Sequence, residues 1–197
     1  MTDNLSIVYF VTGNNNKFHE VSELFEKEVI RYKLIQSKIE PTEIQAKSIQ
    51  EVALFKLNSI KNKINSSYFV EDAGFFVDKP LNGFPGVYSS YVFKSIGNEG
   101  ILKLIDDYDN PIAHFSAVIA LYFKPLEKIF LFEGEIKGKV SKKIKGKGGF
   151  GFDPIFVPDV LKNRTFAELS VEEKNEISHR GQALKKLLNF LKKNLNY

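Results

Sequence analysis

The sequence predicts an α/β fold, and three stretches carry this prediction. Residues Ile7–Val11 form a continuous apolar run that is followed by a polar loop and a helical pattern. Ala113–Phe123 and Ile129–Lys139 have the composition of long strands, and Pro125 in their connection indicates a hairpin. Strands that alternate with helical segments are typical of a sheet covered by helices. At 197 residues the chain is expected to form a single domain, residues 1–197, with two lobes.

The composition is that of an ordinary soluble globular protein, with 43% hydrophobic and 26% charged residues. The chain has no cysteine, which excludes disulfides, thiolate metal sites and cysteine nucleophiles. No apolar run reaches transmembrane length and no leader pattern precedes Ile7, so we expect a cytoplasmic protein without a membrane partner. The net charge of +4 suggests an anionic partner, either a nucleotide or a nucleic acid. Much of the excess lies in Lys137–Lys147 and in Lys185–Lys193, of which the second is expected to be a solvated helix face.

The first strand, Ile7–Val11, is apolar throughout, as expected for a strand covered on both faces. The helix after it places Val21, Leu24 and Phe25 on one face. A strand–loop–helix order puts backbone N–H groups and a positive helix end at the edge of a sheet, which suits a phosphate group. The residues that would form this phosphate site are Thr12, Gly13, Asn14, Asn15, Asn16 and Lys17. Because the full P-loop pattern is missing, an ordinary β–α turn is the alternative.

A second strand is expected near Tyr32–Ile35, and an extended segment, Ile39–Gln45, follows it. Glu40 and Glu43 in this segment are candidate metal ligands, although loop carboxylates are usually only solvated. Ser48 and Glu51 then form a capping-box pattern that predicts the start of a helix. Lys56 lies on this helix, and a lysine in that position is most often a surface residue.

An acidic pair, Glu71 and Asp72, is enclosed between two apolar runs. Tyr68–Val70 before it and Phe75–Val77 after it both have strand composition, so the first strand is expected to end at the pair. A buried carboxylate is costly unless a divalent cation, a helix N-terminus or a lysine compensates its charge. The alternative is a β-hairpin in which the acidic pair forms a solvated turn.

Glycine and proline interrupt the next part of the chain. Gly83–Gly86 predicts a tight irregular loop, and Val87–Ser95 and Ile101–Tyr108 are expected to be short helices. In the hairpin that follows, alternation predicts one buried face. Its members are Phe115, Ala117, Ile119, Leu121 and Phe123. His19 and His114 have no partner at ligand spacing and are therefore expected to be structural.

Residues 146–151 match the spacing GxGxxG, but they do not predict a dinucleotide-binding site. That motif requires a helix directly after it, whereas Pro154 breaks the chain here. The segment therefore predicts a pliable loop that presents Phe150, Phe152 and Asp153. The rings could stack on a base and the carboxylate could accept from a ring N–H. Core packing of the two phenylalanines is the competing explanation.

The C-terminal part is predicted to be helical. Ser170 and Glu173 form a second capping-box pattern, which opens a helix carrying Lys174. His179 and Arg180 stand at the start of the last helix, whose leucines have the spacing of a buried face. Cationic donors at a helix start can hold an anion or a carbonyl oxygen.

Four blocks of the sequence, in this order, resemble the inosine triphosphate pyrophosphatase family. The blocks are TGNNNK at Thr12–Lys17, EDAG at Glu71–Gly74 with GFPGVYS after it, GGFGFDPIF at Gly148–Phe156 and AELSVEEKNEISHR at Ala167–Arg180. The resemblance covers nearly the whole chain. Ala73 stands where the family often has serine, which removes a possible hydroxyl contact. Phe152 stands where the family often has a larger aromatic residue.

The resemblance implies an elongated, two-lobed α/β fold with a central mixed β-sheet flanked by helices and a cleft between the lobes. It also implies a homodimer and Mg²⁺-assisted hydrolysis of noncanonical purine nucleoside triphosphates (ITP, dITP and XTP) to the monophosphate and pyrophosphate. No stable nucleic-acid partner is expected. By position, residues 12–17 and Lys56 would bind the phosphates, and Glu43 and Asp72 would hold the metal with Glu71 beside them. Asp72 would also be the catalytic base. The remaining substrate-binding residues would be Ala73, Phe150, Gly151, Phe152, Asp153, Lys174, His179 and Arg180.

A physical hypothesis for base selection follows. A site that aims N–H donors at the 6-oxo group of the purine would place donor against donor when a 6-amino group enters. We expect His179, Arg180 and backbone N–H groups near Phe152 to make this distinction.

Two alternatives remain. A non-enzymatic nucleic-acid binder could use Lys137–Lys147 and the aromatic loop as a stacking platform, but this leaves Glu71 and Asp72 unexplained. A pyrophosphatase of the Maf-like group would act on pyrimidine nucleotides, but its serine- and arginine-rich opening motif is absent.

Overall fold

The computed structural model describes residues 5–28 and 31–194. The elements are β1 (Ser6–Val11), α1 (Asn15–Lys27), β2 (Tyr32–Ser37), α2 (Ile49–Ser59), β3 (Ser67–Lys79), β4 (Phe84–Gly86), α3 (Ser89–Leu104), β5 (Ile112–Phe123), β6 (Lys128–Val140), β7 (Phe156–Pro158), α4 (Val171–Ile177) and α5 (His179–Lys193). Short 3₁₀ turns occupy Lys124–Leu126, Asp153–Ile155 and Phe166–Glu168. No helix of the described ranges is both long and apolar enough to cross a membrane.

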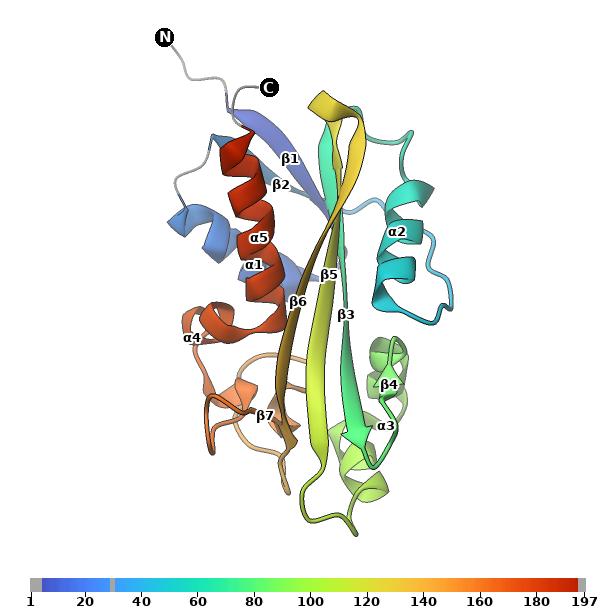
Figure 1. The fold of residues 1–197 in the computed structure, drawn as a ribbon, viewed down its shortest axis with the longest axis vertical. Helices are drawn as coiled ribbons and strands as arrows, with labels where there is room; N and C mark the ends of the chain where they lie inside the picture. Colours follow the sequence, from blue (N-terminus) through green and yellow to red (C-terminus); the bar gives the residue numbers. More distant parts are fainter. Residues whose placement is uncertain (1–4, 29–30, 195–197) are drawn as a thin grey trace. The chain divides into compact units, whose positions relative to one another are not determined.

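The strands form one seven-stranded mixed sheet, which confirms the predicted α/β class (Figure 1). The order is β2-β1-β3-β5-β6-β7, and β4 pairs with β3 off this path. β1 lies parallel to both β2 and β3, with Phe10 opposite Gln36 in the first pair and opposite Phe69 in the second. β4 and β7 pair antiparallel with β3 and β6.

The chain divides into two compact units, which are described separately. Unit 1 comprises residues 1–72, 118–133 and 181–197. Unit 2 comprises residues 73–117 and 134–180. The long strands β3, β5 and β6 each contribute one part to unit 1 and the other to unit 2.

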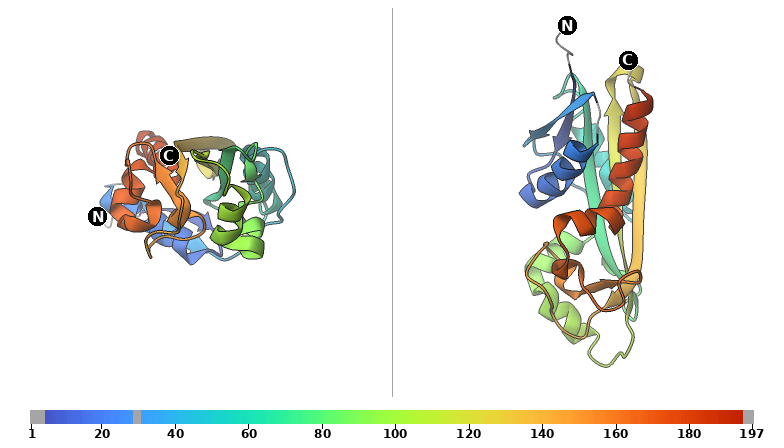
Figure 2. Two further views of the ribbon diagram at one scale, coloured as in Figure 1. Left: turned by 90° about the horizontal axis from the view of Figure 1, so that it is seen from below. Right: turned by 90° about the vertical axis from the view of Figure 1, so that its left-hand side faces the viewer.

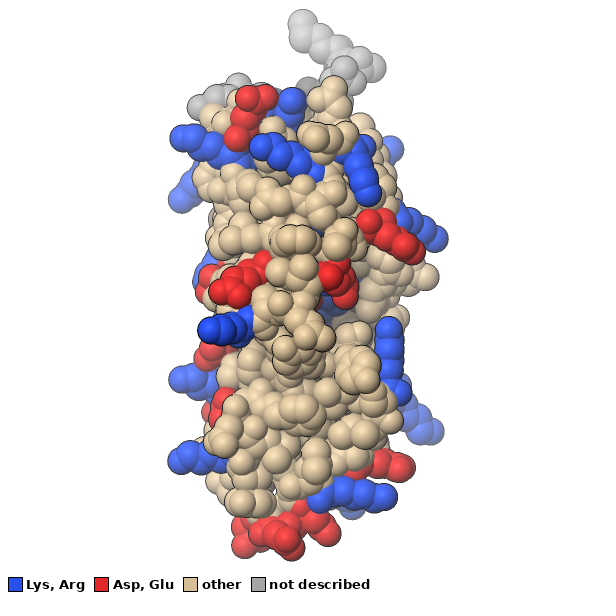
Figure 3. All heavy atoms as spheres, turned by 90° about the vertical axis from the view of Figure 1, so that its right-hand side faces the viewer, with Lys and Arg blue, Asp and Glu red and all other residues tan. Residues whose placement is uncertain are grey.

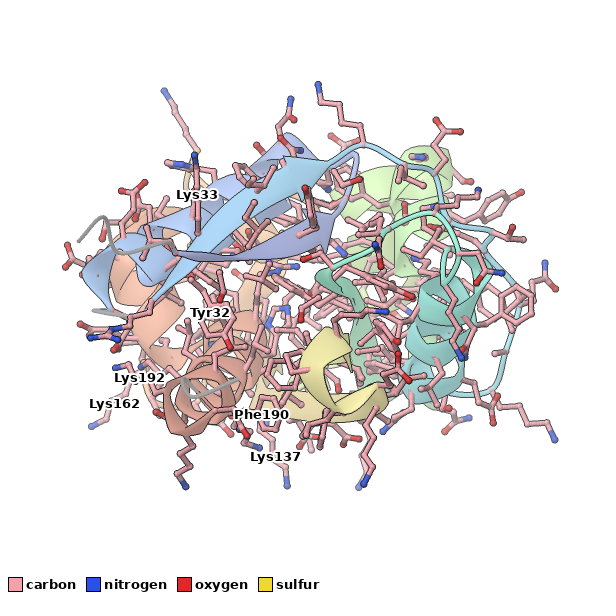
Figure 4. The ribbon with its side chains drawn as sticks, turned by 90° about the horizontal axis from the view of Figure 1, so that it is seen from above. Tyr32, Lys33, Lys137, Lys162, Phe190 and Lys192 are labelled. Atoms are coloured by element: carbon pink, nitrogen blue, oxygen red, sulfur yellow. The ribbon has the colours of Figure 1, made fainter. Side chains whose placement is uncertain are left out.

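In unit 1, helices cover both faces of the strands. α1 and α5 pack side by side on one face (Figures 1 and 2), where Phe10 and Phe69 stack with their ring centroids 4.6 Å apart. Because neighbouring side chains of a strand point to opposite faces, Tyr68 points to the other face, and its hydroxyl donates to the Leu57 carbonyl of α2. At the end of the unit, the half-buried Phe190 of α5 packs against the core, whereas Lys33 points away from the sheet (Figure 4).

Unit 2 has its own aromatic core. The ring centroid of Phe75 in β3 lies 4.9 Å from that of Phe115 in β5 and 5.0 Å from that of Phe152. Phe156 and Phe166 complete this cluster, and their rings are 5.0 Å apart. The core of unit 2 is therefore built from β3, β5, β6, α3 and the segment after β6.

Several local predictions are confirmed and others are wrong. The hairpin exists, but from Ala117 onward β5 is buried on both faces and not on one alone. The short helices predicted around Gly97 merge into α3, which is interrupted at that residue, and the predicted loop Gly83–Gly86 contains β4. Ser48 caps α2 by accepting from the Glu51 N–H, but the Glu51 carboxylate accepts from the N–H of Lys47 and so does not close a capping box.

The acidic pair differs most from expectation. Glu71 and Asp72 lie inside β3, which continues for seven residues beyond Asp72, from Ala73 to Lys79. The strand therefore does not end at the pair, and the alternative of a hairpin with a solvated acidic turn is wrong. The second capping box is confirmed, because Ser170 accepts from the Glu173 N–H while the Glu173 carboxylate accepts from the Ser170 N–H.

Candidate active site

The loop between β1 and α1 is organised by its own side chains. Asn14 is the N-cap of α1, and its Oδ1 accepts from the N–H groups of Asn16 and Lys17 at 3.0 and 3.1 Å. The Thr12 hydroxyl accepts from the N–H of Asn14 at 3.1 Å. Gln36 of the neighbouring strand donates to the Thr12 carbonyl, also at 3.1 Å. The loop is thus held in one shape, and it presents exposed polar side chains at a helix N-terminus.

Lys17 connects this loop to the acidic pair. Its Nζ lies 2.6 Å from Oε2 of Glu71, whose side chain is buried, and 3.4 Å from the carbonyl oxygen of the same residue. A buried carboxylate requires a partner, and here a lysine 54 positions earlier in the chain supplies it. A divalent cation, a helix N-terminus or a lysine could compensate the charge of the acidic pair. The structure uses a lysine.

Lys56 bridges two further carboxylates. Its Nζ lies 2.8 Å from Oε1 of Glu43 and 3.4 Å from Oδ1 of Asp72. Burial lowers the pKa of the Lys56 ammonium, but Asp72 and Glu43 outweigh this effect and hold the pKa above its ordinary value. Burial raises the pKa of the Asp72 carboxyl, although Lys17 and Lys56 act in the opposite direction. Lys56 is therefore a buried residue of the acidic cluster, not a surface lysine.

The donor set around Lys56 fits a small divalent cation. Within the described residues, no three histidine, cysteine or acidic side chains converge closely enough to enclose a metal ion. Mg²⁺, however, is usually held by one or two carboxylates together with water and the phosphates of a substrate. Glu43 and Asp72 already face one cation, the Lys56 ammonium, and both offer hard oxygen ligands. Two carboxylates of this kind suit a cation that arrives with a nucleotide.

Unit 2 holds a second polar cluster. Oδ2 of Asp153 accepts from Nζ of Lys174 at 2.6 Å and from the N–H of Phe150 at 2.7 Å. The Lys174 ammonium also lies 5.0 Å from the centroid of the half-buried Phe150 ring, and the Arg180 guanidinium lies 5.3 Å from it. The Lys174 ammonium and the Arg180 guanidinium thus both lie over the Phe150 ring. Phe150 is held by backbone and ring contacts in a position from which a base could stack on it.

The family model described as the Ham1 family matches residues 8–190. The chain belongs to the Ham1 family. Among its relatives, the dITP/XTP pyrophosphatase of Thermococcus kodakarensis is 45% identical over 186 residues, which cover 94% of this chain and 97% of that protein. The dITP/XTP pyrophosphatase of Pyrococcus horikoshii is 42% identical over 190 residues, which cover 96% and 99% of the two chains.

Solved structures of Ham1 proteins have the same fold. A HAM1 protein from Coxiella burnetii superimposes with a TM-score of 0.81 at 29% identity, covering 95% of this chain and 99% of that chain. A nucleoside-triphosphatase, or dITP/XTP pyrophosphatase, from Mycobacterium abscessus superimposes with a TM-score of 0.69 at 31% identity, covering 94% and 99%. These comparisons support the predicted family and its α/β fold.

In this Ham1 family chain the site residues predicted from the sequence fall into two groups. Residues 12–17, Glu43, Lys56, Glu71 and Asp72 belong to unit 1, where the ion pairs of Lys17 and Lys56 bring the acidic members together. The others belong to unit 2, and they are Ala73, Phe150, Gly151, Phe152, Asp153, Lys174, His179 and Arg180.

Two members of the second group, Phe152 and His179, pack against aromatic rings of unit 2. Phe152 is 3% exposed and packs between Phe75 and Phe93, so core packing accounts for its ring. Only its backbone remains a candidate contact for a base. His179 is buried and stacks on Phe115 at 4.7 Å with nearly parallel rings. Its imidazole is therefore packed against the unit 2 core.

Sequence reasoning missed Gln36, which donates to the Thr12 carbonyl and approaches the Asn15 side chain at 3.4 Å. A polar residue near the end of the strand that runs parallel to β1, directly beside residues 12–17, is the signal that could have identified it. His114 was predicted to be structural. Its Nδ1 lies 2.9 Å from Asp78, and its ring stacks on Phe76 at 4.5 Å.

Proposed function

We propose that this chain hydrolyses deaminated purine nucleoside triphosphates, ITP, dITP and XTP, to the monophosphate and pyrophosphate. Membership of the Ham1 family and the names of its relatives support the reaction class. The observation that carries the proposal is the acidic cluster of unit 1, in which Lys17 and Lys56 pair with Glu71, Asp72 and Glu43. Residues 1–197 would act as one catalytic domain in which unit 1 binds the phosphates and unit 2 binds the base.

Unit 1 would bind the triphosphate group of the substrate. Lys17 and Lys56 would turn from their carboxylate partners to the triphosphate oxygens, since both ammonium groups can donate several hydrogen bonds. Glu43 and Asp72, with Glu71 beside them, would hold Mg²⁺. When bound, this ion would neutralise charge on the phosphate oxygens in an in-line displacement. Carboxylates, lysines and backbone N–H groups together provide the positioning on which phosphoryl transfer chiefly depends.

Asp72 is the proposed general base. Its carboxylate would accept a proton from the water whose oxygen attacks the α-phosphorus. The bond from that phosphorus to the bridging oxygen of the β-phosphate then breaks, and pyrophosphate leaves. The raised pKa of Asp72 supports this role, because a carboxylate that is a stronger base than usual accepts a proton more readily.

Unit 2 would bind the purine ring of the substrate. The Phe150 ring would stack on the purine, and Lys174 and Arg180, which lie close to that ring, would face its polar edge. Donors directed at a 6-oxo group exclude adenine, because its 6-amino group would leave them without an acceptor.

The deciding experiment measures pyrophosphate release from ITP, dITP, XTP, GTP, ATP and dTTP, with Mg²⁺ and with EDTA. We expect turnover of the first three nucleotides, little turnover of ATP and dTTP, and none with EDTA. Equal turnover of ITP and ATP would refute the proposed selectivity. Preference for dTTP would instead indicate a pyrimidine-directed enzyme. Salt-dependent binding of single strands without any hydrolysis would indicate a nucleic-acid binder and contradict the expected absence of a nucleic-acid partner.

A homodimer is also proposed. The segment from β4 to α3 exposes apolar side chains, among them Phe84, Tyr88 and Tyr91, of which Tyr91 is 75% exposed. In Figure 3 acidic side chains lie near mid-height, and the surface below them is mainly uncharged, with charged side chains along its edges. A second copy that covers these rings would account for their exposure. Light scattering after size exclusion should give twice the mass of 22.5 kDa for the wild type and the monomer mass for Tyr91→Glu.

A further inference from the structure

Helix α3 contacts the loop 150–153 at two points. Nδ2 of Asn98 donates to the carbonyl oxygen of Gly151 at 3.2 Å. The ring of Phe93 meets that of Phe152 edge-on, with centroids 5.3 Å apart. The two contacts come from either side of Gly97, where the helix is interrupted at φ 63° and ψ −162°. One helix therefore holds both the backbone and an aromatic side chain of this loop.

The contact with Gly151 also determines where the next N–H group points. The carbonyl of Gly151 and the N–H of Phe152 belong to the same peptide group, which is planar and trans. A hydrogen bond that fixes the carbonyl on one side thus directs the N–H to the opposite side. No residue of the described ranges accepts from the Phe152 N–H, so a ligand could supply its acceptor.

Asn98 is not optimised for stability. Its Oδ1 is buried and has no hydrogen-bond partner among the described residues, while its Nδ2 is used for the loop carbonyl. A buried acceptor without a partner destabilises a fold, because the group has lost its hydrogen bonds to water. Groups of this kind that persist in a fold are often found next to functional segments.

We propose that Asn98 is a positioning residue for base selection. By holding the Gly151 carbonyl, it directs the Phe152 N–H at the 6-oxo oxygen of the purine. This inference rests on the proposed function, and it adds a residue on α3 that does not touch the substrate itself.

The test compares Asn98→Leu with the wild type. Leucine has a similar size but cannot donate to Gly151, and it also removes the acceptor that has no partner. We expect kcat/KM for ITP to fall about tenfold, mainly through KM, and the preference for ITP over ATP to fall by a similar factor. The inhibition constant of inorganic tripolyphosphate, which has no base, should stay within twofold of the wild-type value. The thermal midpoint should change by no more than a few degrees.

The matched control is Asn194→Leu, since Asn194 also donates through Nδ2 to a backbone carbonyl, that of Phe190 in unit 1. This control should keep the ITP-to-ATP ratio of the wild type. If Asn98→Leu does not fold, Asn98→Asp is measured instead, because aspartate has the same shape but lacks the donor. The results expected for Asn98→Leu are then expected for Asn98→Asp. Two results for Asn98→Leu would overturn the role of Asn98: an unchanged ITP-to-ATP ratio, or a loss of tripolyphosphate binding as large as the loss of kcat/KM for ITP. If the wild type hydrolyses ITP, either result leaves the proposed function intact. Failure of the wild type to hydrolyse ITP would overturn both.

Discussion

The ammonium group of Lys174 lies 2.6 Å from Oδ2 of Asp153, and the two side chains are only 4% and 3% exposed. Removing one partner of such a pair leaves the other charge buried beside a neutral group. The pair also holds the N–H of Phe150, so it links the stability of unit 2 to the geometry of the proposed base site.

The first prediction is that Asp153→Asn lowers the free energy of unfolding by about 3–5 kcal/mol. The double variant Asp153→Asn/Lys174→Met should recover part of this loss, because it removes the buried charge together with its partner. Urea denaturation of both variants measures the effect. As a control, Asp109→Asn removes an ion pair with Lys142 in which both side chains are exposed, and it should change stability by no measurable amount. A loss as small as that of the control would show that burial does not couple Asp153 and Lys174.

The second prediction concerns Asp72, whose pKa is raised chiefly by burial. Because the folded chain holds the proton to a higher pH than the unfolded chain, the ionised carboxylate opposes folding at neutral pH. Asp72→Asn should therefore fold with a thermal midpoint equal to or above that of the wild type. Its pyrophosphate release should fall roughly 10²–10⁴-fold, as expected for the loss of a general base. Calorimetry and steady-state rates test the two parts separately, and unchanged turnover would place the base elsewhere.

The third prediction is a pH profile. kcat/KM reports the ionisation of the free enzyme. Since Asp72 is active as a base only when ionised and its pKa is raised, kcat/KM for ITP should increase as the pH rises through a value above the ordinary range of aspartate, about 3.9. Asp72→Asn should lack this acidic limb in its residual activity. An acidic limb that persists in the variant would assign the ionisation to another group.

The sequence was sufficient for those features that depend on neighbouring residues. The capping box of Ser170 and Glu173 closes within four positions, so its pattern can be read locally and proved correct. The strand–loop–helix order around Asn14 is likewise local, and the structure confirms the helix N-terminus there. The family could also be predicted, because four ordered blocks together are far more specific than any one of them.

The sequence was insufficient where distant residues decide the outcome. β3 continues through Glu71 and Asp72 because Lys17 and Lys56 compensate the buried charges, and nothing within the strand itself shows this. Phe152 lies in the core because rings from β3 and α3 enclose it, although its loop suggested a base-stacking residue. Both faces of β5 are buried beyond Ala117, which alternation within a single strand could not predict.

The fourth prediction concerns the cation. Glu43→Gln should raise the Mg²⁺ concentration that gives half-maximal pyrophosphate release by about tenfold or more, because an amide is a poorer ligand than a carboxylate. Glu40→Gln is the matched control, since Glu40 lies in the same exposed segment but forms no ion pair with Lys56. A Mg²⁺ titration at fixed ITP compares the two. Equal curves for both variants would remove Glu43 from the metal site.

The last prediction uses two glycines with similar left-handed backbones, Gly149 at φ +65° and Gly151 at φ +62°. A Cβ at Gly151 would meet no atom within 4 Å, so Gly151→Ala should cost only the backbone strain of alanine there, about 1–2 kcal/mol. A Cβ at Gly149 would clash with Oδ2 of Asp153, and that carboxylate would have to leave both Lys174 and the N–H of Phe150. Gly149→Ala should therefore destabilise the protein clearly more than Gly151→Ala in urea denaturation. Equal losses would mean that the carboxylate can move without cost, and the buried ion pair would then not fix the loop.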